Sequence, residues 1–141
     1  MSWIGPTAAA LAAVATATVI WLRWQLLVVT VQGLSMTPTH RDGDRLLVRR
    51  RQPGSLRPGQ AVVVDLVPHS NDVSGRVRRI IKRVAAVPGD PVPDGVDWVG
   101  ALVPPGKLVL LGDNSARSTD SRQFGFVDAR RVVGVVVWSI D

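Results

Sequence analysis

The feature that most constrains this chain is a stretch near its N-terminus that has no charged side chain. It runs for 20 residues, from Trp3 to Leu22. A helix rises about 1.5 Å per residue, so a helix of this length would span roughly 30 Å, the thickness of the hydrocarbon core of a bilayer. Tryptophans lie near both ends of the stretch, as in interfacial aromatic belts, and Arg23 marks its exit. The stretch therefore predicts one transmembrane helix.

Two other interpretations fit the composition of this stretch. One is a helix buried in a protein core, and the other is a signal peptide removed at the small residues 15–17. A removable signal should begin with positive charge, whereas residues 1–7 carry none besides the amino terminus, and apolar residues 19–22 continue past the supposed cleavage site. We therefore favour an uncleaved anchor that comprises residues 1–24.

Short apolar and β-branched runs follow the anchor and alternate with Pro-Gly turns. The runs that we predict as strands are 26–31, 45–49, 61–67, 77–87, 107–111 and 132–138. Residues 71–75 and 91–106 read as loops, and no long amphipathic helix is expected after residue 24. The fold class that follows is mostly β: one compact antiparallel domain, residues 25–141, behind one N-terminal transmembrane helix.

The composition excludes several kinds of chemistry. Among its 141 residues the chain has no Cys and two His, so it cannot form a disulfide, a thiolate nucleophile or the usual zinc sites of Cys and His. Its net charge of +6 would suit nucleic acid or anionic lipid, but the arginines are scattered along the sequence and aromatic residues make up only 5%. We expect no nucleic-acid partner.

A serine in a tight bend is the first candidate for catalysis. Ser35 lies directly after a predicted strand, with Gly33 two residues before it and Pro38 three residues after it. Such a bend can present the hydroxyl and the backbone amide of the serine together, as an acyl-transfer nucleophile and an oxyanion donor require. An ordinary Ser/Thr/Pro loop is the alternative that this segment leaves open.

A serine nucleophile needs a base, and the two histidines are the first candidates for a Ser-His-Asp arrangement. His40 lies on the same loop as Ser35, before a polar stretch, and His69 follows a proline in what reads as a surface connection. We expect both histidines to be solvated.

Lys82 is the better candidate for the base. Of the 17 basic residues 15 are Arg, yet Lys82 interrupts a run of arginines, and only a lysine can lose its proton. The period of a strand places Ile80, Lys82 and Val84 on one face, where burial would lower the pKa of the amine so that it can accept the Ser35 proton. The alternative is a lysine at a sheet edge that extends its ammonium group into water.

A third polar segment, residues 112–125, holds many short polar side chains between glycines. Asp120 and Arg122 can form an ion pair, and the serine hydroxyls can hydrogen-bond a neutral lysine. An Asx-rich turn is the alternative interpretation of this segment.

In this order, the three segments resemble those of the type I signal peptidases, the membrane-anchored serine proteases of the S26 family. The resemblance covers roughly residues 23–138. Its motifs are Gly33-x-Ser35-Met36-x-Pro38-Thr39, then Lys82-Arg83-Val84 with Pro88-Gly89-Asp90, and then Gly112-Asp113-Asn114 through Ser118, Asp120-Ser121-Arg122 and Gly125. All three motifs behind one anchor form a highly specific pattern.

The resemblance implies a role for each matched residue. Ser35 would be the nucleophile and Lys82 the general base, with Ser118 orienting the lysine amine. Asp120 and Arg122 would form a supporting ion pair.

The resemblance also implies that Met36 lines the substrate groove and that the backbone N–H of Ser35 is an oxyanion donor. Some members supply a second donor from a hydroxyl at the position of Gly33, so that donor is unassigned here. No metal or organic cofactor is implied. Other departures from the family pattern are at His40, Ala86 and Ser115.

The function implied by the resemblance is that of a single-pass membrane serine endopeptidase, which cuts exported preproteins after a small residue. Its partners would be these preproteins, through their signal peptides, and the lipid bilayer. The domain would face the extracytoplasmic side of the cell membrane, although Arg23 after the helix favours the cytoplasmic side. The short segment between Lys82 and Gly112 leaves no room for the large second β domain of some members.

Three alternatives stay open. The first is a dedicated maturation protease of the same family for one specific precursor. The second is a catalytically silent anchored module that binds signal peptides or an acidic partner, and the third is a self-cleaving regulator. The sequence does not define the oligomeric state.

Overall fold

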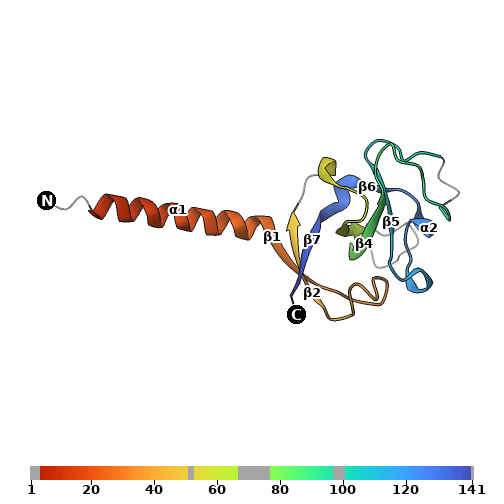
Figure 1. Ribbon diagram of the computed structural model, residues 1–141, viewed down its shortest axis with the longest axis horizontal. Helices are drawn as coiled ribbons and strands as arrows, with labels where there is room; N and C mark the ends of the chain where they lie inside the picture. The colour runs from red at the N-terminus through yellow and green to blue at the C-terminus, as the bar shows by residue number, and fades with distance from the viewer. Residues whose placement is uncertain (1–3, 51–52, 67–76, 97–100, 141) are drawn as a thin grey trace.

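The structure, a computed structural model, describes residues 4–50, 53–66, 77–96 and 101–140. A single long helix, α1 (Ile4–Gln25), precedes the β domain and stands clear of it (Figure 1). Its segment Thr7–Gln25 is long and apolar enough to cross a membrane, and none of it is buried within the protein. Leu11 is 72% exposed. The alternative of a buried core helix is therefore wrong.

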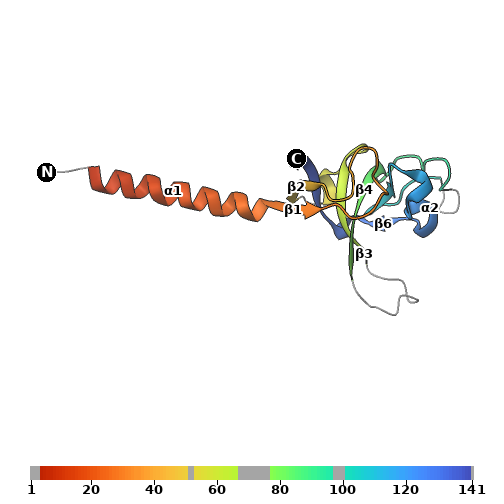
Figure 2. The same cartoon turned by 90° about the horizontal axis from the view of Figure 1, so that it is seen from below.

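Within the described residues, the β domain contains seven strands, and each neighbouring pair is antiparallel. In chain order they are β1 (Leu26–Thr30), β2 (Arg45–Arg50), β3 (Ala61–Leu66), β4 (Arg78–Ala86), β5 (Lys107–Leu111), β6 (Val127–Asp128) and β7 (Val132–Ile140). The order in the sheet is β1-β2-β7-β3-β4-β5-β6. Figure 2 shows these strands gathered at the end of α1, which confirms the predicted fold class.

The helix passes into the sheet without a linker. α1 ends at Gln25 and β1 begins at Leu26, which pairs with Arg49 of β2. β2 runs antiparallel to β1, so its last residues return to the end of α1. The predicted anchor, residues 1–24, stops one residue before the end of the helix, and Arg23 lies in the last helical turn.

The centre of the sheet is tightly packed at Gly134 of β7. A Cβ atom at this position would lie 2.5 Å from the carbonyl oxygen of Arg49 and 2.8 Å from Cγ1 of Val48. The close approach of β2 and β7 therefore requires a glycine here.

Alternate residues of the central strands fill two cores. Val62, Val64 and Val84 pack in one cluster with Leu108 and Leu110 of β5. The opposite faces of β3 and β4 contribute Val63 and Ile81 to a second cluster, which also holds the following residues: Val31, Met36, Leu46, Val48 and Ala61. Lys82 lies opposite Val62 in the β3–β4 register, so it belongs to the face of the first cluster.

Five short elements were not predicted from the sequence. They are β6, the helix α2 (Ser121–Phe124) and the 3₁₀ turns η1 (Pro53–Ser55), η2 (Ser115–Arg117) and η3 (Ala129–Arg131). None is longer than four residues, which is too short for a periodic pattern. The predicted loop 71–75, residue 67 and His69 lie outside the described residues.

Candidate active site

Lys82 is buried in the middle of the sheet. β4 lies between β3 and β5, and the Lys82 residue is 4% exposed. Its Nζ donates a hydrogen bond of 2.9 Å to Oγ of Ser118. The alternative of a lysine extending into water at a sheet edge is therefore wrong. Burial lowers the pKa of Lys82, the negative charge of Asp120 opposes this effect, and the positive charge of Arg122 lowers the pKa further.

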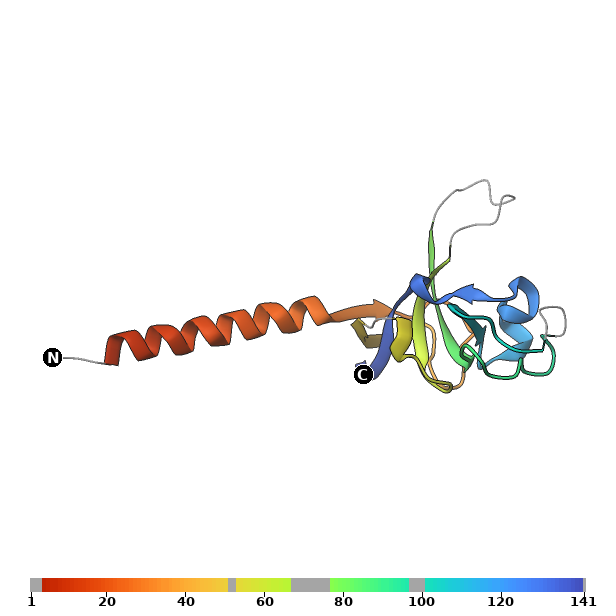
Figure 3. The ribbon, with the colours of Figure 1, turned by 90° about the horizontal axis from the view of Figure 1, so that it is seen from above.

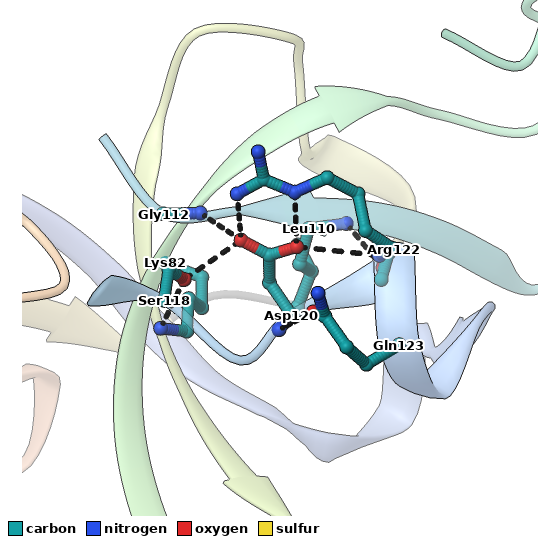
Figure 4. Close-up of polar contacts among 8 residues, drawn as sticks. Lys82, Leu110, Gly112, Ser118, Asp120, Arg122 and Gln123 are labelled. Atoms are coloured by element: carbon teal, nitrogen blue, oxygen red, sulfur yellow. Dashed lines mark hydrogen bonds and ion pairs between the residues drawn. The ribbon is translucent and has the colours of Figure 1, made fainter. Parts of the chain in front are cut away.

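Asp120 is the centre of the polar network around this lysine (Figure 4). It is completely buried, and its Oδ2 accepts hydrogen bonds from Ser118 Oγ at 2.7 Å and Gly112 N at 2.8 Å. Arg122 binds both carboxylate oxygens, with Nη2 to Oδ2 at 2.6 Å and Nε to Oδ1 at 2.9 Å. Burial raises the pKa of Asp120, but the hydrogen bonds from Arg122, Gly112 and Ser118 outweigh it and hold the pKa at about 2. The carboxylate is therefore charged at neutral pH.

The local sequence folds Asp120 into place as the cap of α2. Its side chain accepts from the backbone N–H of Arg122, and Oε1 of Gln123 accepts from the backbone N–H of Asp120 at 2.9 Å, which completes a capping box. Ser121, also buried, accepts from the backbone N–H of Leu110 in β5 at 2.8 Å. These bonds fix the segment of Ser118 to the sheet that carries Lys82.

The direction of the hydrogen bonds matters for Lys82. Ser118 has a single hydroxyl proton, which it donates to Asp120, so it can only accept from the lysine. A neutral Lys82 amine thus uses one N–H on Ser118 and keeps its lone pair for another partner. An amine held in this way can act as a base.

Ser35 lies next to this network through its backbone. Its carbonyl oxygen accepts from the backbone N–H of Asn114 at 2.9 Å, and Nδ2 of Asn114 donates to Oγ1 of Thr37 at 2.9 Å. A Cβ atom at Gly112 would lie 2.7 Å from the same Ser35 carbonyl and 2.5 Å from Cβ of Ser118. The loop of Ser35 and the segment of Ser118 therefore meet at Gly112.

Four of the expected site residues are joined by direct bonds: Lys82, Ser118, Asp120 and Arg122. Ser35 is half-buried, and its hydroxyl makes no hydrogen bond to Lys82 or to any other residue that the structure describes. Met36 is 1% exposed and packs in the second core cluster.

His40 differs from the expectation of a solvated side chain. Its backbone N–H donates to the carbonyl of Met36 at 2.9 Å, which closes a turn within the loop. The residue is half-buried, and its Nδ1 atom is buried without a hydrogen-bond partner among the described residues.

A second ion pair, not predicted from the sequence, lies beside the site. Arg83 binds Asp113 through two bonds of 2.7 and 2.6 Å, and its Nη1 donates to the carbonyl of Gly59 at 2.7 Å. The hydrogen bonds from Arg83 lower the pKa of Asp113. The alternation of side chains along β4 could have indicated that Arg83 lies on the face opposite Lys82, but it does not identify Asp113 as the partner. The pair ties β4 to the segment that holds Asn114.

An apolar helix, an antiparallel β domain and a buried lysine beside a serine loop together suit a membrane-bound hydrolase. A family model described as "Signal peptidase, peptidase S26" matches residues 1–94 and 94–140. A signal peptidase I of Bacillus licheniformis is 31% identical, over 74% of this chain and 70% of its own. A signal peptidase IB of Staphylococcus aureus strain Mu50 is 29% identical, over 76% of this chain and 73% of its own. The chain belongs to the S26 family of signal peptidases.

Proposed function

We propose that this protein is a membrane-bound serine endopeptidase, which removes signal peptides from exported preproteins by cutting after small residues. Membership of the S26 family supports a signal peptidase function. The observation that carries the catalytic assignment is the buried Lys82, which has a lowered pKa and donates to Ser118 beside the loop of Ser35. Ser35 is then the nucleophile and Lys82 the general base.

In the acylation step, the neutral amine of Lys82 accepts the proton of the Ser35 hydroxyl. Oγ of Ser35 attacks the carbonyl carbon of the scissile peptide bond, and the carbonyl oxygen becomes an oxyanion. When the C–N bond breaks, the Lys82 ammonium gives its proton to the leaving amine. The signal peptide stays on Ser35 as an ester. Lys82 then deprotonates a water molecule, which attacks the ester and restores the hydroxyl of Ser35.

Ser118, Asp120 and Arg122 position the base in this proposal. Ser118 holds the Lys82 amine in a single direction and leaves its lone pair free. A buried carboxylate alone would favour the charged ammonium form, and the guanidinium of Arg122 offsets this effect. The ion pair thus fixes Ser118, while Arg122 opposes the increase that Asp120 causes in the pKa of Lys82.

The backbone N–H of Ser35 is the proposed donor to the oxyanion. The backbone N–H of Gly33 is already bound to Oδ1 of Asp42 at 2.7 Å, so it is not a free second donor. We propose that Met36, which directly follows Ser35, lines the groove that receives the small residue before the cleavage site.

The proposal assigns residues 1–24 to the membrane anchor and residues 25–141 to the catalytic domain on the extracytoplasmic side. An anchored domain suits a substrate whose own apolar segment lies in the same bilayer. Protease accessibility in intact spheroplasts tests the orientation. A domain that stays fully protected until the membrane is opened would contradict it.

The test of the activity is cleavage of a model preprotein by the detergent-solubilised full chain across pH 6 to 10. The expected result is a cut after the small residue, with activity rising through one basic pKa. Ser35→Ala and Lys82→Arg should both be inactive, because arginine keeps the charge but cannot be deprotonated. Variants that cut as well as the wild type would refute the assignment of Ser35 and Lys82.

A panel of unrelated preproteins defines the substrate range. Cleavage of several supports a general signal peptidase. Cleavage of one precursor alone would favour the dedicated maturation protease of the same family.

A further inference from the structure

Arginines that are scattered along the sequence gather at one end of the sheet. The register places Arg49 opposite Leu26, the first residue after α1, and Arg50 opposite Gly134 of β7. η3, which directly precedes β7, contributes Arg130 and Arg131. These arginines therefore lie at the end of the sheet where α1 joins it.

An open depression of about 560 Å³ lies among these residues. Its charged lining consists of Arg50, Arg79, Arg130, Arg131 and Asp65, and its apolar lining includes Val77, which is 57% exposed. Figure 3 shows β3 and β4 rising from the sheet beside the start of β7. The depression is lined by residues of these three strands, including Asp65, Arg79 and Val132. We call the four arginines of this depression the basic face.

The basic face has an excess of positive charge. Arg79 pairs with Asp65 at 2.8 Å and Arg130 pairs with Asp128 at 2.8 Å. Arg50 and Arg131 are exposed, and neither forms an ion pair with a residue that the structure describes. Two guanidinium groups in one depression are therefore available to an anionic partner.

The position of the basic face indicates what that partner is. α1 has the length and composition of a membrane anchor, Arg23 lies in its last turn, and no linker separates it from β1. The end of the sheet that carries Arg49 and Arg50 is thus held close to the point where the anchor leaves the bilayer. The planar guanidinium group of arginine can donate two hydrogen bonds to the oxygens of one phosphate. Anionic lipids also attract basic groups that lie within roughly 10 Å of the membrane surface.

We propose that the basic face binds the phosphate headgroups of anionic phospholipids, and so holds the β domain against the membrane of its own anchor. This inference goes beyond the proposed peptidase function and needs none of its catalytic residues. The apolar Val77 at the depression suits the same interfacial environment.

The test uses the full chain in nanodiscs of phosphatidylcholine, with or without phosphatidylglycerol. Because the chain has no cysteine, Val77→Cys provides a single site for a fluorescent label, and lipids with a nitroxide on the headgroup quench it on close approach. We expect stronger quenching in discs that contain phosphatidylglycerol, and loss of the difference at high salt.

The decisive variant is Arg50→Gln with Arg131→Gln. Each arginine near an anionic surface contributes about fivefold to association, so removing two should shift the docking equilibrium about 25-fold towards the undocked state. The matched control, Arg45→Gln with Arg57→Gln, removes the same charge from exposed residues outside the depression and should quench like the wild type. Arg50→Lys with Arg131→Lys should also dock, because it retains both charges.

Equal quenching in the two kinds of disc would overturn the proposal, as would a glutamine variant that docks like its control. If the glutamine variant has a lowered melting temperature, the lysine variant tests the proposal instead. Its quenching in discs with phosphatidylglycerol should then fall as the salt concentration rises, and quenching that does not change with salt would contradict the proposal. A soluble poly-aspartate peptide, added to phosphatidylcholine discs, tests an acidic polypeptide as the partner. Binding of this peptide without any effect of phosphatidylglycerol would assign the face to a polypeptide and contradict the lipid proposal.

Discussion

Replacing Gly112 by alanine is expected to damage catalysis more than folding. Gly112 lies where the loop of Ser35 meets the segment of Ser118. The added Cβ would lie 2.5 Å from Cβ of Ser118 and 2.7 Å from the carbonyl oxygen of Ser35. Carbon atoms in ordinary contact are about 3.5 Å apart, so Ser118 must move by about 1 Å. The residue that orients Lys82 and the proposed nucleophile would therefore separate.

The size of both effects follows from this displacement. Overpacking of this kind costs about 1–3 kcal/mol in the free energy of unfolding. A displacement of about 1 Å among catalytic groups costs about 100-fold in rate, or about 2.7 kcal/mol in the activation barrier. The variant should thus remain folded but lose about two orders of magnitude in kcat.

Gly134→Ala is the matched control for this experiment. Its Cβ would meet Arg49 O and Val48 Cγ1 at similarly short distances, in the centre of the sheet instead of beside Ser118. Both variants are measured by urea unfolding and by cleavage of a model preprotein at saturating substrate. If Gly112→Ala keeps a kcat within a few fold of that of Gly134→Ala at equal stability, the proposed junction of Ser35, Gly112 and Ser118 has no catalytic importance.

Three further predictions concern the charges around Lys82. Asp120→Asn should lower the free energy of unfolding by about 3–5 kcal/mol at pH 7, because it removes the buried carboxylate that forms an ion pair with the partly buried guanidinium of Arg122. Since the pKa of Asp120 is held at about 2, below the unfolded value of about 3.9, this difference should shrink as the pH falls towards 2; a constant difference in urea unfolding would contradict it. Arg122→Gln removes a charge that lowers the pKa of Lys82, so the acidic limb of the kcat/KM profile should move to higher pH. Asp120→Asn removes a charge that raises this pKa, so the limb should move to lower pH. Shifts of both variants in the same direction would refute the electrostatic argument. Lys82→Met should raise the melting temperature at pH 7. Burial lowers the pKa of the Lys82 amine, so the amine disfavours the folded state until the pH approaches its pKa in the unfolded chain, about 10.4. A variant that is less stable than the wild type at pH 7 would contradict this prediction.

The elements that the sequence predicted well are those with a strong local pattern. The charge-free stretch indicated α1, and β-branched runs between turns indicated six of the seven strands. The alternation of Ile80, Lys82 and Val84 also predicted the face of Lys82, because the pairing of β4 with β3 is regular here and the register shift towards β5 comes only after Val84.

The features that escaped prediction depend on contacts between distant segments. The bond from Asn114 to the carbonyl of Ser35 and the pair of Arg83 with Asp113 join residues about 30 or more positions apart, for which local patterns hold no information. His40 was expected to be solvated because its neighbours are polar, yet its Nδ1 atom is buried. The basic face likewise arises from the strand register.

The direct junction of α1 and β1 fixes the distance between the end of the helix and the loop of Ser35. β1 has five residues, which at about 3.4 Å each extend no more than about 17 Å beyond the end of the helix, and the loop of Ser35 begins there. An extended substrate chain rises by the same amount per residue. A peptide whose own helix ends level with α1 therefore needs only about five extended residues to reach the height at which that loop begins. The spacing between the end of an apolar segment and its cleavage point would then be set by the length of a strand.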